Sequence, residues 1–341
     1  MRNYLSAFLI ASLLMLACNK REVPETINTL TNMMVSATAS TDNSGNVAFV
    51  VSATNAVSYE FDFGNGIFLN SQSGVLTYKY PASGTYNVNV IAKNSSGQTL
   101  AKSTTVNVIV AISLVWSDEF NANGAPDPAK WGYDIGTGSG GWGNNELQYY
   151  TSRTDNAIVS NGVLQIIAKK ELLGGSNYTS ARLLSKDKFS FKYGKIEVRA
   201  KLPAGIGTWP AIWMLGSNIS KAGWPACGEI DIMEHKGSEL NKVYGTLHHP
   251  GHSGGSADSK TVIISNATTE FHRYTVDWTD ASIKFLVDDV LFFTFSNAST
   301  LPFNQPFFLL LNLAMGGTFG GSVDPAFTNA SMEIDYVRVY Q

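Results

Sequence analysis

The sequence predicts an all-β chain in which a small β-sandwich precedes a large antiparallel β-sandwich. Side-chain character alternates with period two in many short segments, and Gly, Asn, Ser and Pro clusters separate them. No long amphipathic helical pattern interrupts these segments. All 7 tryptophans lie beyond residue 110, which indicates a change of character there. We therefore expect two folded units, residues 27–110 and residues 111–341, after an N-terminal segment.

The N-terminal segment has the composition of an export signal. Residues 4–17 form an apolar run that follows Arg2 and is too short to span a bilayer, so residues 1–17 are expected to be cleaved off. The stretch MLAC at residues 15–18 resembles a bacterial lipobox, which would make Cys18 the lipid-modified first residue. Residues 18–26 then form a polar tether, and we expect an outer-membrane lipoprotein of the bacterial cell envelope. Ordinary cleavage with free secretion is the alternative.

Composition excludes several classes of function. The chain has 24 Lys and Arg against 27 Asp and Glu, a formal net charge of −3, which provides no cationic field for nucleic acid. If Cys18 carries lipid, Cys227 has no disulfide partner, so a disulfide framework is excluded. Cys227 is either a small buried filler or a wall of a binding site. No local motif places a base beside it, which argues against a cysteine nucleophile.

The first unit shows the strand pattern of a small β-sandwich. Alternating strands are predicted at residues 47–51, 58–63, 85–90 and 103–110. The stretch FDFGNG at residues 61–66, followed by aromatic segments at 78–81 and 83–86, resembles a PKD-type domain in which Asn65 replaces the usual Asp. Its glycines permit the positive φ of a tight turn. We expect a spacer or accessory module rather than a sugar-binding one, because a fold alone confers no function.

The second unit contains longer strands. Residues 194–202 alternate strictly, and the apolar side chains Ile196, Val198, Ala200 and Leu202 should face inward. Residues 271–278 and 283–295 predict two more strands, the second broken by a turn at Asp288-Asp289. Residues 332–340 close the chain as another alternating strand. Residues 111–341 should therefore form one large antiparallel sandwich.

Three acidic residues occupy one predicted strand. In an ideal strand Glu229 and Asp231 point to one face while the isoleucines between them enter the core. Glu234 has the opposite parity. A β-bulge at Ile232-Met233 would return it to the face of Glu229, and bulges occur beside active sites because they redirect side chains. We therefore expect all three acids on one open face.

Such a cluster can hydrolyse a glycosidic bond. Mutual repulsion should raise the pKa of at least one acid and keep it protonated, giving the ionised and protonated pair that the reaction needs. Four strand steps of ~3.3 Å separate the two Glu backbones by roughly 13 Å, but inward-leaning side chains can bring the carboxyls to ~5–5.5 Å, the separation typical of retaining enzymes. Glu229 would be the nucleophile, Glu234 the acid and then base, and Asp231 would hold Glu229. A solubilising surface strand or a cation site is the alternative.

Here the chain resembles glycoside hydrolase family 16, and within it the bacterial β-1,3-glucanases. The run from Glu229 to Glu234 matches the bulged E-x-D-x-x-E signature of that family. Further matching stretches are WSDEF (116–120), NNELQYY (144–150), SAR (180–182), YGKIE (193–197), WPAIWMLG (209–216), GWPA (223–226) and DYVRVY (335–340). The resemblance implies a β-jelly-roll whose concave face holds the substrate cleft, and endo-acting, retaining hydrolysis of β-1,3-glucan. Mixed-linkage β-1,3-1,4-glucan, a galactan, or glycan binding without turnover remain the alternatives.

Sugar binding requires aromatic platforms and hydrogen-bonding side chains. Trp209 and Trp213 have the same parity in one strand and should share a face, although two tryptophans can also simply pack. Trp224 could add a wall. The resemblance places Asn144, Arg182 and His248 near the cleavage point; Arg182 could instead be a surface ion-pair partner and Asn144 a turn residue. Asn312, in an apolar strand, is either a sugar contact or a satisfied buried amide.

Metal binding is not expected to take part in the reaction. The stretch HHPGH at residues 248–252 lacks an accompanying acid and a recognised zinc spacing, so no zinc site is predicted there. The family resemblance implies a structural calcium held by Glu119, the Gly162 carbonyl and Asp335, away from the chemistry. No cofactor is expected for catalysis. The expected partner is a polysaccharide, membrane contact is through the lipid only, and the protein should be a monomer.

Overall fold

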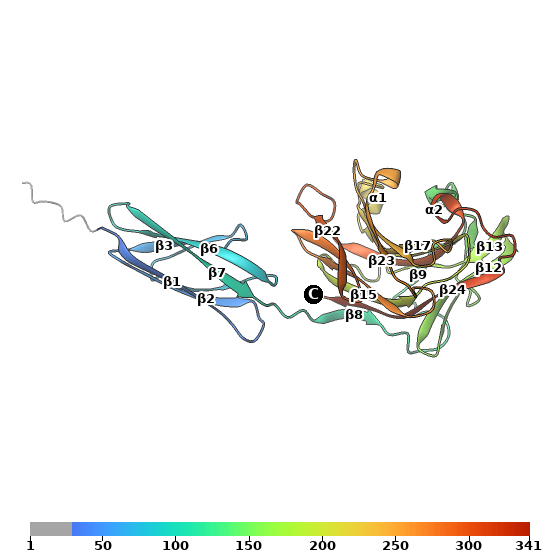
Figure 1. Cartoon of the computed structure of the whole chain (residues 1–341), viewed down its shortest axis with the longest axis horizontal. Helices are drawn as coiled ribbons and strands as arrows, with labels where there is room; N and C mark the ends of the chain where they lie inside the picture. Colours follow the sequence, from blue (N-terminus) through green and yellow to red (C-terminus); the bar gives the residue numbers. More distant parts are fainter. Residues whose placement is uncertain (1–28) are drawn as a thin grey trace, which may run out of the picture. The chain divides into compact units, whose positions relative to one another are not determined.

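The computed structural model describes residues 29–341 (Figure 1). The predicted export signal, Cys18 and the tether lie outside the described residues. The chain divides into two compact units, the first ending at Ala111 and the second running from Ile112 to Gln341. No helix in the described part is long and apolar enough to cross a membrane.

The first unit is a sandwich of two sheets with strand orders β1-β2-β5 and β4-β3-β6-β7. Its strands are β1 (Thr31–Ala39), β2 (Asn46–Thr54), β3 (Ser58–Asp62), β4 (Phe68–Ser71), β5 (Val75–Lys79), β6 (Gly84–Lys93) and β7 (Thr99–Val108). The four predicted strands correspond to β2, β3, β6 and β7, and are confirmed. Strands β1, β4 and β5 were not predicted. The residues at 31–39 are mostly small or hydroxylated, so their alternation is weak in the sequence.

The FDFGNG stretch forms a tight turn after β3. Gly64 and Gly66 have φ of 74° and 82°, as the sequence predicted. A Cβ atom on Gly64 would lie 2.5 Å from the main-chain oxygen of Asn87, so this position also requires close backbone approach. The amide nitrogen of Gly64 donates to Oδ1 of Asp62 at 2.9 Å, and Nδ2 of Asn65 donates to the hydroxyl of Tyr78 at 2.9 Å. The role of this turn is structural.

One sheet of the second unit has ten strands. They are β8 (Leu114–Asp118), β10 (Gln148–Tyr150), β11 (Ala157–Ser160), β12 (Val163–Leu173), β13 (Ser176–Ser180), β15 (Gly194–Lys201), β20 (His272–Trp278), β21 (Ser282–Val287), β22 (Val290–Ser296) and β24 (Asn329–Tyr340). The predicted strands at 194–202, 271–278, 283–295 and 332–340 are therefore confirmed. The turn between β21 and β22 is at Asp288 and Asp289, whose φ values of 48° and 68° fit a tight hairpin.

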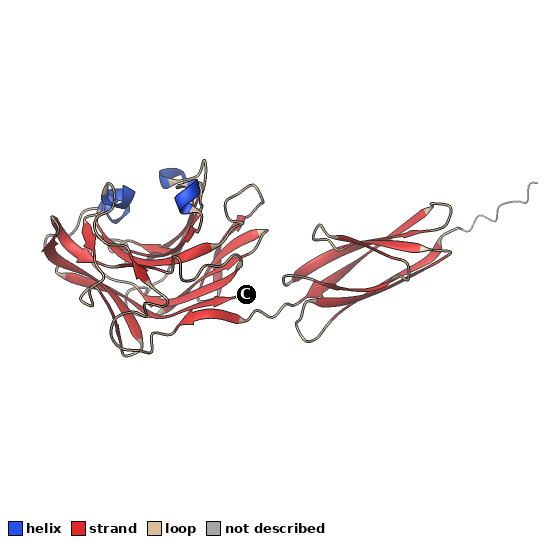
Figure 2. Ribbon diagram, turned by 180° about the vertical axis from the view of Figure 1, so that it is seen from behind, coloured by secondary structure: helices blue, strands red, loops and turns tan. Residues whose placement is uncertain are grey.

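The other sheet has seven strands in the order β19-β18-β17-β16-β23-β14-β9. They are β9 (Gly132–Tyr133), β14 (Arg182–Leu184), β16 (Thr208–Gly216), β17 (Glu229–His235), β18 (Lys242–His248), β19 (Asp258–Ile263) and β23 (Phe307–Met315). The described helical turns are short: η1 (Gly141–Asn145), α1 (Ile219–Ala222), η2 (Gly254–Ser256) and α2 (Gly317–Gly320). Figures 1 and 2 show α1 and α2 at the rim of this curved sheet, whose other face covers β15 and β24.

The core of the second unit lies between its two sheets. Ile196, Val198 and Ala200 of β15 are fully buried, as their alternation predicted, and they belong to one cluster with Ile212 of β16 and Ile230 of β17. Removing this apolar surface from water is the main stabilising contribution to such a sandwich. The core side of β17 is therefore committed to packing, and its opposite face is free to carry polar side chains.

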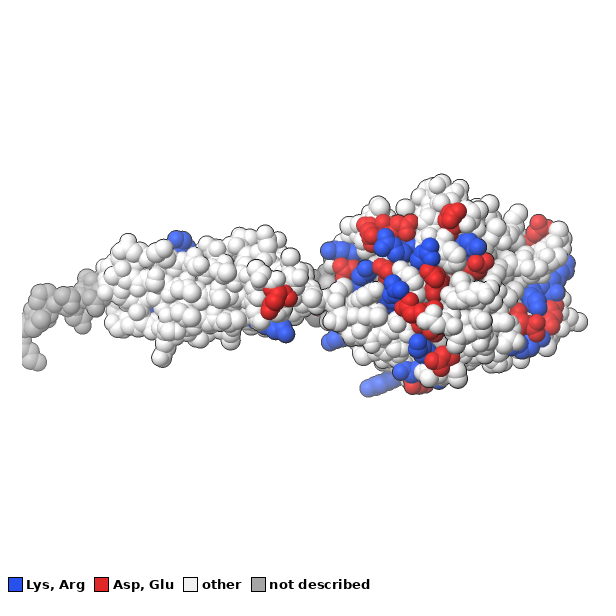
Figure 3. All heavy atoms as spheres, turned by 90° about the horizontal axis from the view of Figure 1, so that it is seen from below, with Lys and Arg blue, Asp and Glu red and all other residues white. Residues whose placement is uncertain are grey.

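Charged side chains of both signs are interleaved on the face of the second unit seen in Figure 3. Ion pairs between β24 and its neighbours include Arg338 with Glu119, Arg199 with Asp335, and Lys201 with Glu333. Each positive group is thus matched by a nearby carboxylate. This pattern fits the small net charge of the sequence, which supplies no cationic field.

Candidate active site

The predicted β-bulge in β17 is present. Strand β16 pairs Ala211 with Glu234, Trp213 with Asp231 and Leu215 with Glu229, and the register shifts between Ile212 and Trp213. The partner strand β18 shows a shift over the same part of β17. β17 therefore contains one more residue than the stretch of each neighbour that pairs with it. This extra residue turns Glu234 to the same face as Glu229 and Asp231. All three acids face the same side of the sheet, above a core filled by the isoleucines of the same strand.

That side of the sheet carries an open cleft of about 660 Å³. All three acids line it. Other side chains that line it are Trp142, Asn144, Glu146, Arg182, Trp209, Trp213, Trp224, Tyr244, Thr246, His248, Asn312 and Phe319. They come from strands of the seven-stranded sheet and from the loops at the rim of that sheet. The cleft therefore combines carboxylates with aromatic and amide groups, as sugar recognition requires.

Two tryptophans donate hydrogen bonds to the outer acids. Nε1 of Trp224 donates to Oε2 of Glu229 at 2.9 Å, and Nε1 of Trp209 donates to Oε1 of Glu234 at 3.0 Å. Each bond fixes the orientation of one carboxyl group and favours its ionised form. These two tryptophans therefore position the acids, a role that the sequence pattern did not predict.

His248 lies at the other side of the acids. Its Nδ1 accepts a hydrogen bond from the amide nitrogen of Gly254 at 3.1 Å, which places the proton of the neutral ring on Nε2. That Nε2 lies 3.2 Å from Oδ2 of Asp231 and 3.8 Å from Oε1 of Glu229. The Nε2–H group of His248, at the end of β18, therefore faces both carboxylates and can donate a hydrogen bond to Asp231.

Burial raises the pKa of all three acids. For Glu229 it raises the pKa well above the ordinary range, and the charge of Asp231 adds to the effect. For Asp231 burial also acts first, followed by the charge of Glu234. For Glu234 burial raises the pKa, while the hydrogen bond from Trp209 opposes it. The three groups cannot all be ionised near neutrality, so the cluster holds at least one proton.

We expect Asp231→Asn to stabilise the fold at alkaline pH. Asp231 is buried, and its Oδ2 lies 3.2 Å from Nε2 of His248. Because its folded pKa is raised above the unfolded value, stability is present below the unfolded pKa and is lost as pH rises through the folded pKa. Asparagine does not ionise, so the variant does not lose stability in this way as the pH rises. Its Tm should exceed that of the wild type at pH 9, by roughly 2–4 °C for each kcal/mol of unfolding free energy that is recovered. At pH 5 the two Tm values should be close to each other.

The control for this prediction is Glu270→Gln, which changes an exposed carboxylate. Differential scanning calorimetry across pH should show no pH-dependent Tm difference for it. An Asp231→Asn difference of equal size at pH 5 and pH 9 would assign the effect to packing and contradict the raised pKa.

The sequence left open whether Arg182 contacts sugar or forms an ion pair, and its position in the structure suits both roles. Its Nε lies 3.0 Å from Oδ2 of Asp134, so it is an ion-pair partner. Its guanidinium also lies over the rings of Trp142 and Trp213, at 4.7 and 4.8 Å from the ring centroids. These contacts hold it at the cleft, so it can present donors to a sugar.

The two predicted amide contacts differ in how they are held. Nδ2 of Asn144 donates to Oε1 of Glu146 at 3.3 Å, from the rim turn η1. Asn312 is 6% exposed; its Nδ2 donates to the hydroxyl of Tyr150 at 3.0 Å and its Oδ1 accepts from Nε1 of Trp213 at 2.7 Å. Asn312 is thus a satisfied buried amide at the cleft floor, whereas Asn144 is at the rim.

The tryptophans are not equivalent platforms. Trp209 and Trp213 share the cleft face, as their parity predicted. Trp209 is 8% exposed and packs against Phe319, with ring centroids 5.1 Å apart, and Arg182 covers one face of Trp213. Trp224 is 49% exposed, so it offers the largest open indole surface.

Several cleft residues were missed by the sequence interpretation. Glu146 accepts hydrogen bonds from Asn144, from Gln148 at 2.6 Å and from the hydroxyl of Tyr150 at 3.2 Å. Trp142, Tyr244 and Phe319 also line the cleft. Trp142 and Phe319 lie far from β17 in sequence and Tyr244 lies on the next strand, β18; of the missed residues only Glu146 had a signal, in the NNELQYY stretch.

Cys227 and the predicted calcium residues do not belong to the cleft. Cys227 is fully buried beside Leu215 and Leu310, and burial raises the pKa of its thiol to about 11. It is the buried filler of the two alternatives.

The calcium prediction names carboxylates that already have partners. Glu119 forms two hydrogen bonds with Arg338, at 2.9 and 2.7 Å, and Asp335 is paired with Arg199 at 2.5 Å. Because both carboxylates face guanidinium groups, this arrangement does not fit a calcium ion held by these side chains together with the Gly162 carbonyl. No role in the reaction is assigned to such an ion.

The expectation that the HHPGH histidines lack a nearby acid is wrong. Asp258, at the start of β19, lies 3.0 Å from Nε2 of His249 and 3.1 Å from Nδ1 of His252. Pairing of β18 with β19 brings the aspartate back beside the histidines, with Leu247 opposite Asp258. Asp258 lies on the next strand, so no short sequential zinc spacing includes it.

Comparisons with known proteins agree with this geometry. The family described as glycosyl hydrolases family 16 matches residues 144–338, and a second family, described as beta-glucan synthesis-associated protein SKN1/KRE6/Sbg1, matches residues 46–230. A beta-glucanase of Rhodothermus marinus is 48% identical over 244 residues, covering 67% of this chain and 85% of that protein. The X-ray structure of the laminarinase from Rhodothermus marinus matches with a TM-score of 0.65 at 48% identity, over 68% of this chain and 98% of that one.

Two further relatives indicate the range of substrates. The structure of a LamA variant from Zobellia galactanivorans, in complex with laminaritriose and laminaritetraose, matches with a TM-score of 0.63 at 45% identity, over 68% of this chain and all (100%) of that one. A keratan-sulfate endo-1,4-beta-galactosidase of Sphingobacterium multivorum is 37% identical over 261 residues, covering 74% of this chain and 60% of that protein.

Proposed function

The chain belongs to glycoside hydrolase family 16, and from this membership and the geometry of its cleft we propose that it is a retaining endo-β-1,3-glucanase. The observation that carries the proposal is the bulge in β17, which turns three acids into one aromatic-lined cleft. The β-glucanase of Rhodothermus marinus, at 48% identity, supports β-1,3-glucan as the substrate.

The proposed reaction is a double displacement. The carboxylate of Glu229 attacks the anomeric carbon while Glu234 gives its proton to the glycosidic oxygen, so the leaving sugar departs as an alcohol. Glu234, now ionised, takes a proton from water, and the resulting hydroxide oxygen attacks the anomeric carbon and releases Glu229. Two inversions restore the original configuration. Asp231 lines the cleft with Glu229 and tunes its protonation, since burial and then the charge of Asp231 raise the pKa of Glu229.

Product analysis by NMR on laminarin tests both the linkage and the stereochemistry. The first product should be the β-anomer, and only 1,3-linkages should be cut. An initial α-anomer would contradict the assignment of Glu229 as nucleophile. The panel should include mixed-linkage β-glucan and galactans, because a keratan-sulfate endo-1,4-beta-galactosidase is 37% identical. Exclusive action on a galactan would overturn the proposed substrate.

The first unit supports a separate proposal, a PKD-type spacer over residues 27–110. Its FDFGNG turn has the positive φ values and the Asp62 hydrogen bond of a structural turn. Deleting this unit should leave kcat/KM on soluble laminari-oligosaccharides unchanged. A rise in KM for the oligosaccharides would instead indicate that the unit binds sugar.

The N-terminal residues support export and lipid anchoring at Cys18. The evidence is the apolar run that ends in MLAC, a segment outside the described residues. The mass of the mature N-terminus tests this: a diacylglyceryl-modified Cys18 is expected, and an unmodified N-terminus would indicate free secretion.

A further inference from the structure

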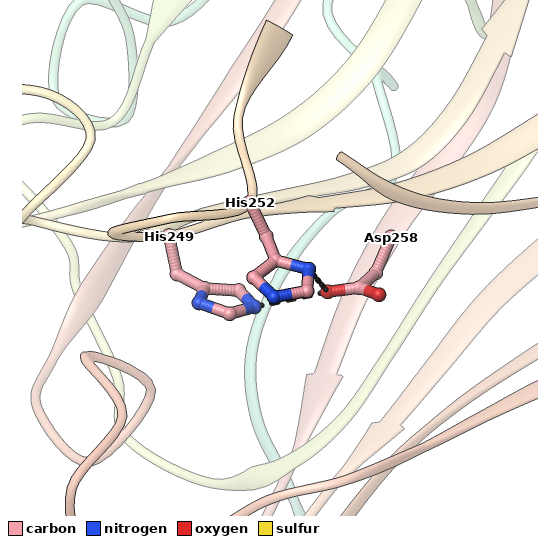
Figure 4. Close-up of side chains that lie close together, drawn as sticks. All are labelled: His249, His252 and Asp258. Atoms are coloured by element: carbon pink, nitrogen blue, oxygen red, sulfur yellow. Dashed lines mark hydrogen bonds and ion pairs between the residues drawn. The ribbon is translucent and has the colours of Figure 1, made fainter. Parts of the chain in front are cut away.

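Three side chains converge just beyond the cleft, at the end of β18. Nε2 of His249 and Nδ1 of His252 both face Oδ2 of Asp258, at 3.0 and 3.1 Å. One ligand atom from each residue lies within 4.8 Å of the other two. Figure 4 shows the two imidazole rings side by side with the carboxylate at their edge.

The backbone holds the two histidines in this position. His249 and His252 exchange two main-chain hydrogen bonds of 2.9 Å, which close a two-residue turn through Pro250 and Gly251. Gly251 has a φ of 83°, which favours glycine, and Pro250 has a restricted φ. Paired residues of a hairpin place their side chains on one face, and the two rings are stacked with centroids 4.8 Å apart.

The other two elements of the cluster are also fixed. The ring of His249 is buried and packs against Phe295 and Phe303, with centroid distances of 5.7 Å to each. Asp258 is held by the pairing of β19 with β18. The three ligand atoms therefore converge without rearrangement of the backbone. This matters for affinity because little conformational entropy remains to be lost on binding.

The chemistry of the three atoms selects a class of ion. Two imidazole nitrogens and a carboxylate oxygen are ligands of zinc, whereas calcium prefers oxygen ligands alone. Zinc–ligand distances of about 2.0–2.2 Å place tetrahedral ligands roughly 3.4 Å apart, which is close to the observed separations from Asp258. His252 has a half-exposed side chain (54%), so water can reach the remaining position.

We propose that His249, His252 and Asp258 form a binding site for zinc, or for a divalent cation with the same ligand preference, completed by water. The ion binds through Nε2 of His249, Nδ1 of His252 and a carboxylate oxygen of Asp258. Each imidazole then carries its proton on the other ring nitrogen. The site lies on the segment between β18 and β19, outside the three catalytic acids.

The ion would link the Pro250-Gly251 turn to β19. The segment between them includes Gly254, which lines the cleft and whose amide nitrogen donates to His248. Bound zinc therefore braces the segment that orients His248. At a zinc concentration about 100 times the Kd, this binding should raise the Tm of the full-length protein by roughly 5–10 °C.

Isothermal titration calorimetry of the full chain with ZnCl₂ tests the site. We expect one zinc per chain, and His252→Ala should weaken binding by at least about 100-fold because it removes a ligand. The substituted side chain is half exposed, so the fold should persist. Asp258→Asn is a second disrupting variant, and its effect should have the same direction. Equal zinc affinity in the wild type and His252→Ala would overturn the proposal.

Two controls separate this site from other histidine and carboxylate groups. His272→Gln changes a histidine that pairs with Asp288 elsewhere in the second unit, and it should leave zinc affinity unchanged. Glu229, Asp231 and His248 also lie within 4.8 Å of one another, so Glu229→Gln is the control for the cleft. It should bind zinc as the wild type does. Loss of binding in Glu229→Gln but not in His252→Ala would place zinc at the acids and contradict the proposal, as would calcium binding of equal affinity.

Discussion

Glu229→Ala is expected to lower kcat on laminarin by about four orders of magnitude or more. The substitution removes the nucleophile of the proposed double displacement, and loss of a nucleophile is among the most costly changes in an enzyme. Glycan binding should persist, because Trp213, Trp224 and Arg182 remain in the cleft. Reducing-sugar release and isothermal titration calorimetry with laminari-oligosaccharides measure the two effects separately.

Azide should restore turnover to this variant. Alanine leaves space beside the anomeric carbon, where azide can attack while Glu234 protonates the leaving oxygen. The single displacement inverts the configuration, so the expected product is an α-glycosyl azide from a β-glucan, detectable by NMR. Absence of this product, together with hydrolysis at the wild-type rate, would show that Glu229 is not the nucleophile.

The control for Glu229→Ala is Glu270→Gln, which changes an exposed acid that does not line the cleft. It should keep wild-type kcat and KM. If the protein only binds glycan, the wild type has no hydrolysis to lose, and the comparison of wild type with Glu229→Ala would show equal binding and no sugar release from either.

Glu234→Gln is expected to lower kcat/KM on laminarin by about 10²–10⁴-fold. Glutamine cannot protonate the glycosidic oxygen, and general acid catalysis contributes an effect of this size. An aryl glycoside with an activated phenol as leaving group needs little protonation, so its glycosylation step should be much less affected. Equal losses on both substrates would contradict the role of Glu234 as acid.

The pH profile identifies the same group in a second way. Glu234 must be protonated to act as acid, so activity falls as pH rises through its pKa, and burial places this alkaline limb above the ordinary range of a glutamate. In Glu234→Gln the limb should disappear. Trp209→Phe keeps the ring but removes the N–H donor that lowers the pKa of Glu234, so its alkaline limb should move to higher pH.

Trp213→Phe is the matched control for that shift. The N–H of Trp213 donates to Asn312 rather than to an acid, so its loss should change KM and leave the alkaline limb where it is. A limb that moves equally in both variants would indicate a general change in the cleft and would contradict the specific hydrogen bond to Glu234.

Strands with strong alternation were predictable from the sequence because their pattern is local. Strand β15 shows this most clearly: its apolar residues repeat at every second position, and the same residues fill the core. Strand β1 lacks large apolar residues at regular spacing, and β9 and β14 are too short to show a period. Their existence depends on pairing with distant strands, which no local pattern records.

The acid site was also predictable, because few local structures can change the face of a strand on which a side chain lies. Glu234 could reach the face of Glu229 only through an extra residue, and a bulge is the usual way for a strand to accommodate one. The surroundings of the acids were not predictable in the same way. Trp209 and Trp224 could be proposed as sugar platforms, but their hydrogen bonds to the acids depend on side-chain positions across strands and loops.

The linear pattern of residues is enough to predict the all-β class, the strand parity and the bulge that brings Glu229, Asp231 and Glu234 together. These follow from the two-residue period of a strand, which is a property of neighbouring residues. The neighbours of individual side chains appear only in the folded chain: Trp209 donates to Glu234, and Asp258 lies beside His249 and His252. Strand pairing joins residues far apart in the chain, and side-chain chemistry depends on those neighbours as much as on the residue itself.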